Sequence, residues 1–311
     1  MRSWIDSCRS IPSFSEARKV YWSNIGLGRN KEDARYLKGF INMTESDYDF
    51  GLGGDYGTGG FMDDPEDYYP PSPPPTKQIY TMQSGKPIAL HLVGYSPTEA
   101  HTLWNGAKII SDYFEAGPSR VKDKTLLELG AASGLPSLVA GILGAKKVVM
   151  TDFPDPDIVQ TMQKNVDECD ETVEPRGHMV ATVSTTGFIW GADPAPLLAH
   201  LPPQEGAFDV LVLADLLFRH NEHGALVKTI RECLRREPGA TAYVFFTSYR
   251  PWKQDLDMKF FDIAREAGFV VEQVEERRLE KPLFENDPGD LDVQKTVKGF
   301  TLRWPGEMCS A

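Results

Sequence analysis

The sequence has few cysteines, and no two of them lie close together. The four cysteines occur at Cys8, Cys169, Cys233 and Cys309 in a chain of 311 residues. Paired C-x-x-C motifs are the usual ligands of a structural zinc ion, so the sequence predicts no metal site. Sparse, unpaired cysteines are typical of proteins in reducing compartments, and we therefore expect a cytoplasmic protein.

Long apolar runs and an excess of basic residues are also missing. No stretch approaches the roughly 20 apolar residues that span a bilayer, so the sequence predicts no membrane association. Lys and Arg number 33 against 45 Asp and Glu, which gives a net charge of −12. This charge argues against nucleic acid as a partner and favours a basic or amino-bearing substrate. No pattern indicates an oligomer, and we expect a monomer.

The first 76 residues differ in composition from the rest. Residues 1–40 hold eight basic and four acidic residues, whereas residues 41–75 hold eight acidic and no basic ones. Glycine- and proline-rich segments follow, which bury too little apolar surface to become ordered. We predict a disordered acidic tail over 1–76, with residues 1–42 as an extended start, and one domain over 77–305. The tail either is simply solvated or helps recruit a basic substrate. A transit peptide is disfavoured by the acids Asp6 and Glu16.

The most informative segment reads LLELGAASGLP and runs from Leu126 to Pro136. It predicts a buried strand, a tight turn at Gly130 and Gly134, and a helix; a second strand then ends in Asp152. Glycines allow the backbone to approach a ligand, and a helix N-terminus offers free N–H groups. An acid about twenty residues further on is suited to bind ribose hydroxyls. The sequence therefore predicts a nucleoside-binding βαβ unit.

The details of the turn narrow the choice of nucleoside. A dinucleotide-binding turn requires G-x-G-x-x-G, but Ala132 and Leu135 occupy the third and sixth positions. No lysine follows to bind a pyrophosphate, so a P-loop is excluded. The pattern E-x-G-x-x-x-G, which begins at Glu128, resembles motif I of S-adenosylmethionine-dependent methyltransferases. Their cofactor contains no pyrophosphate, so a turn with fewer glycines is tolerable.

Apolar periodicity predicts an alternating βα architecture over the rest of the domain. The expected class is α/β: a doubly wound, Rossmann-like seven-stranded sheet, preceded by an N-terminal hairpin and a helix. We expect the hairpin strands at 79–82 and 88–93 and sheet strands at 125–130, 147–152, 178–183, 208–214, 240–247, 269–279 and 296–303. The expected helices include 98–116, with Leu103, Ala107, Ile110 and Phe114 facing the core.

Ligands of such sheets bind at the carboxyl ends of the strands. This rule predicts that the ligand contacts the segment from Glu128 to Gly134, then Asp152 and Phe153, and the end of the fourth strand at Ala214. After the third strand, Trp190 either stacks on an adenine or packs beneath its loop. Trp104 lies off the apolar stripe of its helix, so it either packs on a neighbouring element or lines a pocket.

Five segments together resemble the seven-β-strand protein methyltransferases, especially the fungal enzymes that methylate translation elongation factor 1-alpha. They are Leu103–Asn105, Leu127–Ser137, Thr151–Pro154, Trp190–Gly191 and Ala214–Phe218, and the resemblance covers residues 48–304. It implies S-adenosylmethionine as the cofactor. The contacts it implies come from Trp104, Gly130, Ala131, Ala132, Asp152, Trp190 and Ala214; the strand-end rule adds Glu128, Gly134 and Phe153. It also implies a protein substrate, elongation factor 1-alpha, methylated at its N-terminal α-amine and the adjacent lysine.

The implied reaction is attack of a neutral amine on the sulfonium methyl group. An α-amine with a pKa of about 8 is more often neutral at pH 7 than a lysine at about 10.4, so it needs a weaker base. We hypothesise that Asp215 holds the amine or accepts its proton. His220 is a second candidate base, although a structural role is an alternative. Phe218, Tyr249, Arg250 and Trp252 are candidates for lining a substrate channel or for a merely structural loop.

Other functions stay open from the sequence alone. The same fold can methylate another protein lysine or a small amine. A cofactor-binding module without activity is a further alternative, although Asp152, Trp190 and Asp215 are all present. A nucleotide-linked oxidoreductase is disfavoured by Ala132 and Leu135. The sequence does not specify how many methyl groups are transferred.

Overall fold

The domain is built around a seven-stranded sheet. The computed structural model describes residues 73–309, so the predicted tail over 1–76 lies almost entirely outside the described residues. The strand order is β5-β4-β3-β6-β7-β9-β8. β9 runs antiparallel to β7 and β8, and every other pair of neighbouring strands is parallel. The strands are β3 (Thr125–Leu129), β4 (Lys147–Asp152), β5 (Val183–Gly187), β6 (Val210–Ala214), β7 (Thr241–Thr247), β8 (Val270–Arg278) and β9 (Thr296–Arg303). The predicted doubly wound α/β class is confirmed.

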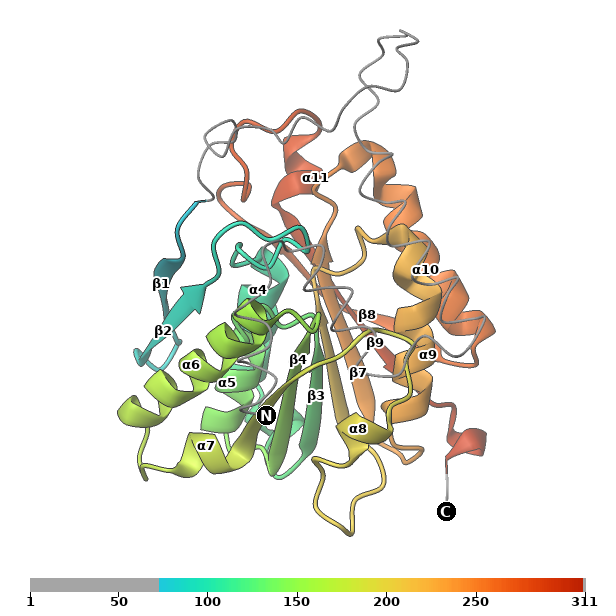
Figure 1. The fold of residues 1–311 in the computed structure, drawn as a ribbon. Helices are drawn as coiled ribbons and strands as arrows, with labels where there is room; N and C mark the ends of the chain where they lie inside the picture. Colours follow the sequence, from blue (N-terminus) through green and yellow to red (C-terminus); the bar gives the residue numbers. More distant parts are fainter. Residues whose placement is uncertain (1–72, 310–311) are drawn as a thin grey trace, which may run out of the picture. The chain divides into compact units, whose positions relative to one another are not determined.

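Helices cover both faces of this sheet (Figure 1). One face carries α4 (Asn105–Glu115), α5 (Leu135–Ile142), α6 (Pro156–Thr172) and α7 (His178–Thr182), and the other carries α8 (Ala195–Leu198), α9 (His223–Cys233) and α10 (Gln254–Glu266). Short elements complete the chain: α11 (Leu291–Lys295) and 3₁₀ turns at Pro118–Arg120, His220–Glu222, Pro251–Lys253 and Gly306–Met308. Because both faces are covered, the five residues of β3 and of β6 are all buried.

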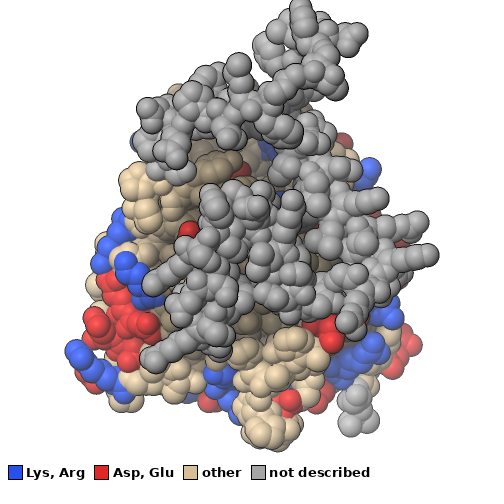
Figure 2. Space-filling view, in the orientation of Figure 1, with Lys and Arg blue, Asp and Glu red and all other residues tan. Residues whose placement is uncertain are grey.

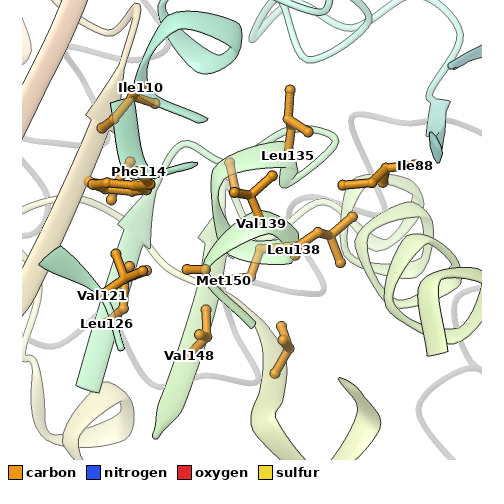
Figure 3. Close-up of a cluster of buried hydrophobic side chains, with 14 of the residues drawn as sticks. Ile88, Ile110, Phe114, Val121, Leu126, Leu135, Leu138, Val139, Val148 and Met150 are labelled. Atoms are coloured by element: carbon orange, nitrogen blue, oxygen red, sulfur yellow. The ribbon is translucent and has the colours of Figure 1, made fainter. Parts of the chain in front are cut away.

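The core beneath α4 and α5 fixes the position of the first strands. Ile110 and Phe114 of α4 are fully buried against Leu126 of β3, and Val148 and Met150 of β4 complete the same cluster (Figure 3). Burying a large apolar side chain contributes about 1.5–3 kcal/mol, so this cluster anchors the strands whose ends carry the glycine turn and the acid.

The N-terminal hairpin, β1 (Thr76–Thr81) and β2 (Pro87–Leu92), is antiparallel as predicted. It is fastened to α6 through Asn165, whose Oδ1 accepts from the His91 backbone N–H at 2.7 Å while its amide donates to the His91 carbonyl at 2.9 Å. The same amide donates to the Ser133 carbonyl at 2.9 Å. The hairpin is thus tied through one buried side chain to the glycine turn.

One predicted element is wrong, and another begins later than predicted. Residues 178–182 form α7 rather than a strand, because Gly177 takes a left-handed φ of 86° that starts a helix and buries Met179 in the core. The strand is β5, which pairs with β4 from Val183 onward. The helix predicted from residue 98 begins only at Asn105, since Glu99 has a φ of 65° that no α-helix accommodates.

Candidate active site

The turn after β3 has the backbone geometry of a close-approach loop. Gly130, Ala132 and Gly134 have φ values of 62°, 49° and 74°, in the left-handed region. A Cβ on Gly130 would come within 2.6 Å of Leu216 Cδ2, and one on Gly134 within 2.3 Å of the Met150 sulfur. The left-handed φ and these close contacts together favour glycine at both positions. Ala132 accepts its unfavourable φ because its N–H donates to Asp152 Oδ2 at 2.7 Å.

Asp152 stands at the end of β4, directly against the turn. Its side chain is buried, and Oδ1 accepts from the Phe153 N–H at 2.6 Å while Oδ2 accepts from Ala132. Burial raises the pKa of Asp152 to about 6, and the two backbone donors oppose that shift. Each carboxylate oxygen has a second lone pair, so the group can still accept hydrogen bonds from two ribose hydroxyls.

Glu128 points into the protein rather than along the turn. Its Oε2 accepts from the Ser137 N–H at 3.0 Å and from the Ser137 hydroxyl, and only 1% of the residue is exposed. Ser137 lies in the first turn of α5, so the carboxyl group binds a free N–H of that helix and fixes its direction. Burial raises the pKa of Glu128 to about 8.

This buried acid predicts how stability depends on pH. Because the pKa is about 8 in the folded state and 4.5 ordinarily, the folded chain binds more protons between these values. The free energy of unfolding is expected to fall as pH rises from 5 to 8, and Asp152 acts in the same direction. Glu128→Gln is expected to reduce this slope by up to about 1.4 kcal/mol per pH unit. Urea unfolding at several pH values measures the slope; an unchanged slope in the variant would contradict the assignment.

Trp190 borders the same turn from the connection after β5. Its Cζ2 atom lies 3.2 Å from the position of a Cβ on Gly130. The adjacent Gly191 is held on both sides: its N–H donates to Thr229 Oγ1 at 2.8 Å, and its carbonyl accepts from Lys228 Nζ at 2.7 Å. The indole is half-buried, so part of its surface is available to a ligand at the turn.

Asp215 follows β6 and joins three elements. Its Oδ2 accepts from the Gly106 N–H at the start of α4 at 2.5 Å, and its Oδ1 accepts from the Thr247 N–H at the end of β7 at 2.8 Å. The Tyr249 hydroxyl donates to Oδ2 at 3.3 Å. The residue is 3% exposed, and burial raises the pKa of its carboxyl to about 7. A Cβ on Gly106 would lie 2.7 Å from Oδ2, so only glycine allows this contact.

Four aromatic rings gather beside Asp215, and we refer to Trp104, Phe218, Tyr249 and Phe284 as the ring cluster. The ring centroid of Trp104 lies 5.9 Å from that of Phe218, 5.1 Å from Tyr249 and 5.8 Å from Phe284. The Trp104 indole N–H donates to the Glu99 carbonyl at 3.1 Å, which fixes the ring. Trp104 therefore packs on rings from neighbouring segments, which is one of the two alternatives predicted for it. Its contact with a cofactor stays a prediction.

Phe284 is the member that the sequence did not identify. It comes from the irregular segment between β8 and α11, where a lone phenylalanine among charged residues carries no periodic signal. Gln294 holds this segment in place, because its amide donates to the carbonyls of Tyr249 at 3.2 Å and Pro288 at 2.9 Å.

The remaining three residues predicted to act as a base or to line a substrate channel make other contacts or are exposed. His220 Nε2 lies 2.7 Å from Asp257 Oδ1, and Asp257 also accepts from the Ser248 hydroxyl at 2.7 Å. The imidazole is therefore engaged with α10. Arg250 donates to the Phe218 carbonyl at 3.2 Å and so holds the backbone of one member of the ring cluster. Trp252 is 62% exposed.

Within residues 73–309, no three His, Cys, Asp or Glu side chains are grouped so as to hold a metal ion. No helix in that range is long and apolar enough to cross a membrane. Among the described residues visible in Figure 2, basic and acidic side chains both occur in small groups.

The sheet order, with the glycine turn after β3 and the acid at the end of the neighbouring β4, defines a Rossmann-like α/β fold. Residues 94–267 match the family described as lysine methyltransferase, and the chain belongs to this family. The protein is accordingly a methyltransferase, which confirms the resemblance noted in the sequence.

Curated relatives match over most of their length. The Gibberella zeae protein named protein N-terminal and lysine N-methyltransferase EFM7 is 72% identical over 260 residues, covering 82% of this chain and 98% of the relative. Proteins of the same name from Neurospora crassa and Schizosaccharomyces pombe are 60% and 37% identical, over 81% and 79% of this chain and 90% and 95% of theirs. A solved structure, a candidate S-adenosylmethionine-dependent methyltransferase from Streptococcus mutans, is 10% identical with a TM-score of 0.48, over 73% and 55% of the chains.

Proposed function

We propose that the protein transfers methyl groups from S-adenosylmethionine to the N-terminal α-amine and the adjacent lysine of translation elongation factor 1-alpha. The observation that carries this proposal is the 72% identity to a protein named for N-terminal and lysine methylation, over 98% of that relative's length. We further propose that the enzyme acts in the cytoplasm as a monomer, with the catalytic domain over residues 77–305.

The residues around the turn fit S-adenosylmethionine, which supplies an electrophilic methyl group on a sulfonium sulfur. Asp152 would bind the ribose hydroxyls, and the bare backbone of the Gly130–Gly134 turn, with Ala131 and Ala132, would lie against the methionyl part. Trp190 and Phe153 would flank the adenine. Ala214, 7% exposed at the end of β6, would complete the contacts with the cofactor. The turn offers no further glycine or lysine for a pyrophosphate, which supports this cofactor over a dinucleotide.

The ring cluster would receive the acceptor amine. Aromatic faces attract ammonium and methylammonium groups by about 0.5–2 kcal/mol, so rings suit both the substrate and its methylated products. The Tyr249 hydroxyl donates to Asp215 Oδ2, so the carboxyl lies beside one ring of the cluster. With its pKa near 7, the Asp215 carboxyl is suited to accept the proton that the amine must lose. His220, bound to Asp257, would support this loop rather than act as the base.

Phe284→Ala tests the contribution of the cluster to substrate binding. Removing one of four rings is expected to raise KM for the protein substrate about 3- to 30-fold, the equivalent of one lost cation–π contact. The affinity for S-adenosylhomocysteine is expected to stay within about twofold. Steady-state kinetics and calorimetry measure the two quantities. Leu291→Ala, an exposed residue just beyond the same segment, is the control and should change neither. A loss of cofactor affinity alone would show that Phe284 serves the cofactor instead.

Labelling in a lysate tests the proposed function as a whole. The purified chain would be incubated with labelled S-adenosylmethionine and a lysate from cells lacking the enzyme, and the labelled site identified by mass spectrometry. We expect one band, elongation factor 1-alpha, labelled within its N-terminal peptide. Label on another protein would support methyltransferase activity but contradict elongation factor 1-alpha as the acceptor. Cofactor binding without any label would indicate an inactive module.

A further inference from the structure

The segment that follows β6 places an arginine beside the glycine turn. Leu216 Cδ2 lies 2.6 Å from the position of a Cβ on Gly130, so this segment rests directly on the turn. The chain then folds back, because the Arg219 N–H donates to the Leu216 carbonyl at 3.2 Å. Arg219 therefore belongs to the wall of the proposed cofactor site, although no motif in the sequence singles it out.

The Arg219 side chain is held in a fixed direction. Its guanidinium lies 5.4 Å from the centroid of the Phe218 ring, and one of its amino groups donates to the Pro97 carbonyl at 3.1 Å. These two contacts fasten it between the ring cluster and the segment that precedes α4. The side chain is thus preorganised, since little conformational freedom is left to lose on binding.

The guanidinium also lacks an anionic partner in the described part of the chain. None of the ion pairs among residues 73–309 includes Arg219. Partial burial lowers its pKa, and the more distant carboxylates of Glu222, Glu99 and Asp152 only partly oppose that shift. Among residues 73–309 the guanidinium donates only to the Pro97 carbonyl. A partly buried cation whose other N–H donors find no acceptor within that range is suited to bind an anion.

We propose that Arg219 binds the carboxylate of the methionyl part of S-adenosylmethionine. The inference rests on the proposed function. If Asp152 holds the ribose and the ring cluster receives the amine that takes the methyl group, the amino-acid tail, which branches from the sulfur, would extend from the space between them. This tail carries the only anion of the cofactor. A guanidinium matches a carboxylate with two parallel N–H···O bonds, which makes Arg219 a positioning residue for the methyl donor.

Two ligands that differ only by the carboxylate test the proposal. Calorimetry would measure the binding of S-adenosylhomocysteine and of its decarboxylated analogue to the full chain. Arg219→Gln is expected to weaken S-adenosylhomocysteine about 10- to 100-fold, as for a lost charged hydrogen bond, and to change the analogue by less than about twofold. Arg219→Lys keeps the positive charge but cannot form two parallel N–H···O bonds, so we expect an intermediate loss of affinity for S-adenosylhomocysteine. Arg265→Gln, which removes an exposed arginine from α10, is the control.

The outcomes separate this inference from the proposed function. Equal weakening of both ligands would overturn it, because the guanidinium would then only hold the loop. Unchanged affinity for S-adenosylhomocysteine in Arg219→Gln would also overturn it, while wild-type binding would leave the proposed function intact. If the wild-type chain binds neither ligand, both the proposed function and this inference are contradicted. If Arg219→Gln does not fold, Arg219→Lys and the two ligands still decide the question.

Discussion

Asp215→Asn is expected to lower the rate of methyl transfer by about 10²- to 10⁴-fold, the usual contribution of a positioned base. The amide cannot accept a proton and replaces one acceptor oxygen by a donor. That donor would face the Gly106 or the Thr247 N–H, so one buried N–H also loses its partner. The variant should therefore lose about 1–3 kcal/mol of stability as well. Single-turnover rates with bound cofactor measure the first effect, and thermal unfolding measures the second.

Asp209 provides the matched control for this prediction. It lies just before β6 as Asp215 lies just after it, and its Oδ2 accepts from the Thr125 N–H at 2.8 Å and hydroxyl at 3.0 Å. Asp209→Asn should thus lower stability by a similar amount without slowing the reaction of the folded enzyme. If both variants reduced the rate equally, Asp215 would have only a structural role.

Asp152→Asn is expected to weaken binding of S-adenosylhomocysteine by about 10- to 100-fold, because hydrogen bonds to a charged group contribute about 1.5–3 kcal/mol. The amide must keep its oxygen toward either the Ala132 or the Phe153 N–H, so it cannot also receive both ribose hydroxyls. Calorimetry measures the effect directly. Asp157→Asn is the control, since it removes the same charge from an exposed acid in the first turn of α6. An affinity within about twofold of the wild type for Asp152→Asn would contradict the ribose contact.

Four of the strands were readily predictable, because β3, β4, β6 and β7 are mostly apolar and separated by helices. Strands buried on both faces, such as Val210–Ala214, leave a continuous apolar run that sequence reading detects. The edge strand β5 was misplaced because its residues Ser184, Thr185 and Thr186 are polar, whereas α7 before it is apolar. Position at the edge of the sheet, rather than propensity, decides this strand, and that information is absent from the local sequence.

The two halves of the candidate site differed in how far the sequence could predict them. The turn and Asp152 come from adjacent parallel strands, whose carboxyl ends must meet, so their proximity followed from the βαβ pattern. The ring cluster joins residues from four segments between 104 and 284, and no spacing rule links them. The inward direction of Glu128 was also hidden, because it depends on the Ser137 N–H at the start of α5.

Methyl transfer to a synthetic peptide tests the central claim most directly. The full chain would be mixed with S-adenosylmethionine and the N-terminal peptide of elongation factor 1-alpha, with its α-amine free or acetylated, and the products read by mass spectrometry. We expect methyl groups on the free α-amine and the adjacent lysine, and none on the blocked α-amine. Cofactor binding without methylation of either amine in the free peptide, under conditions where another protein is methylated, would contradict the proposed acceptor.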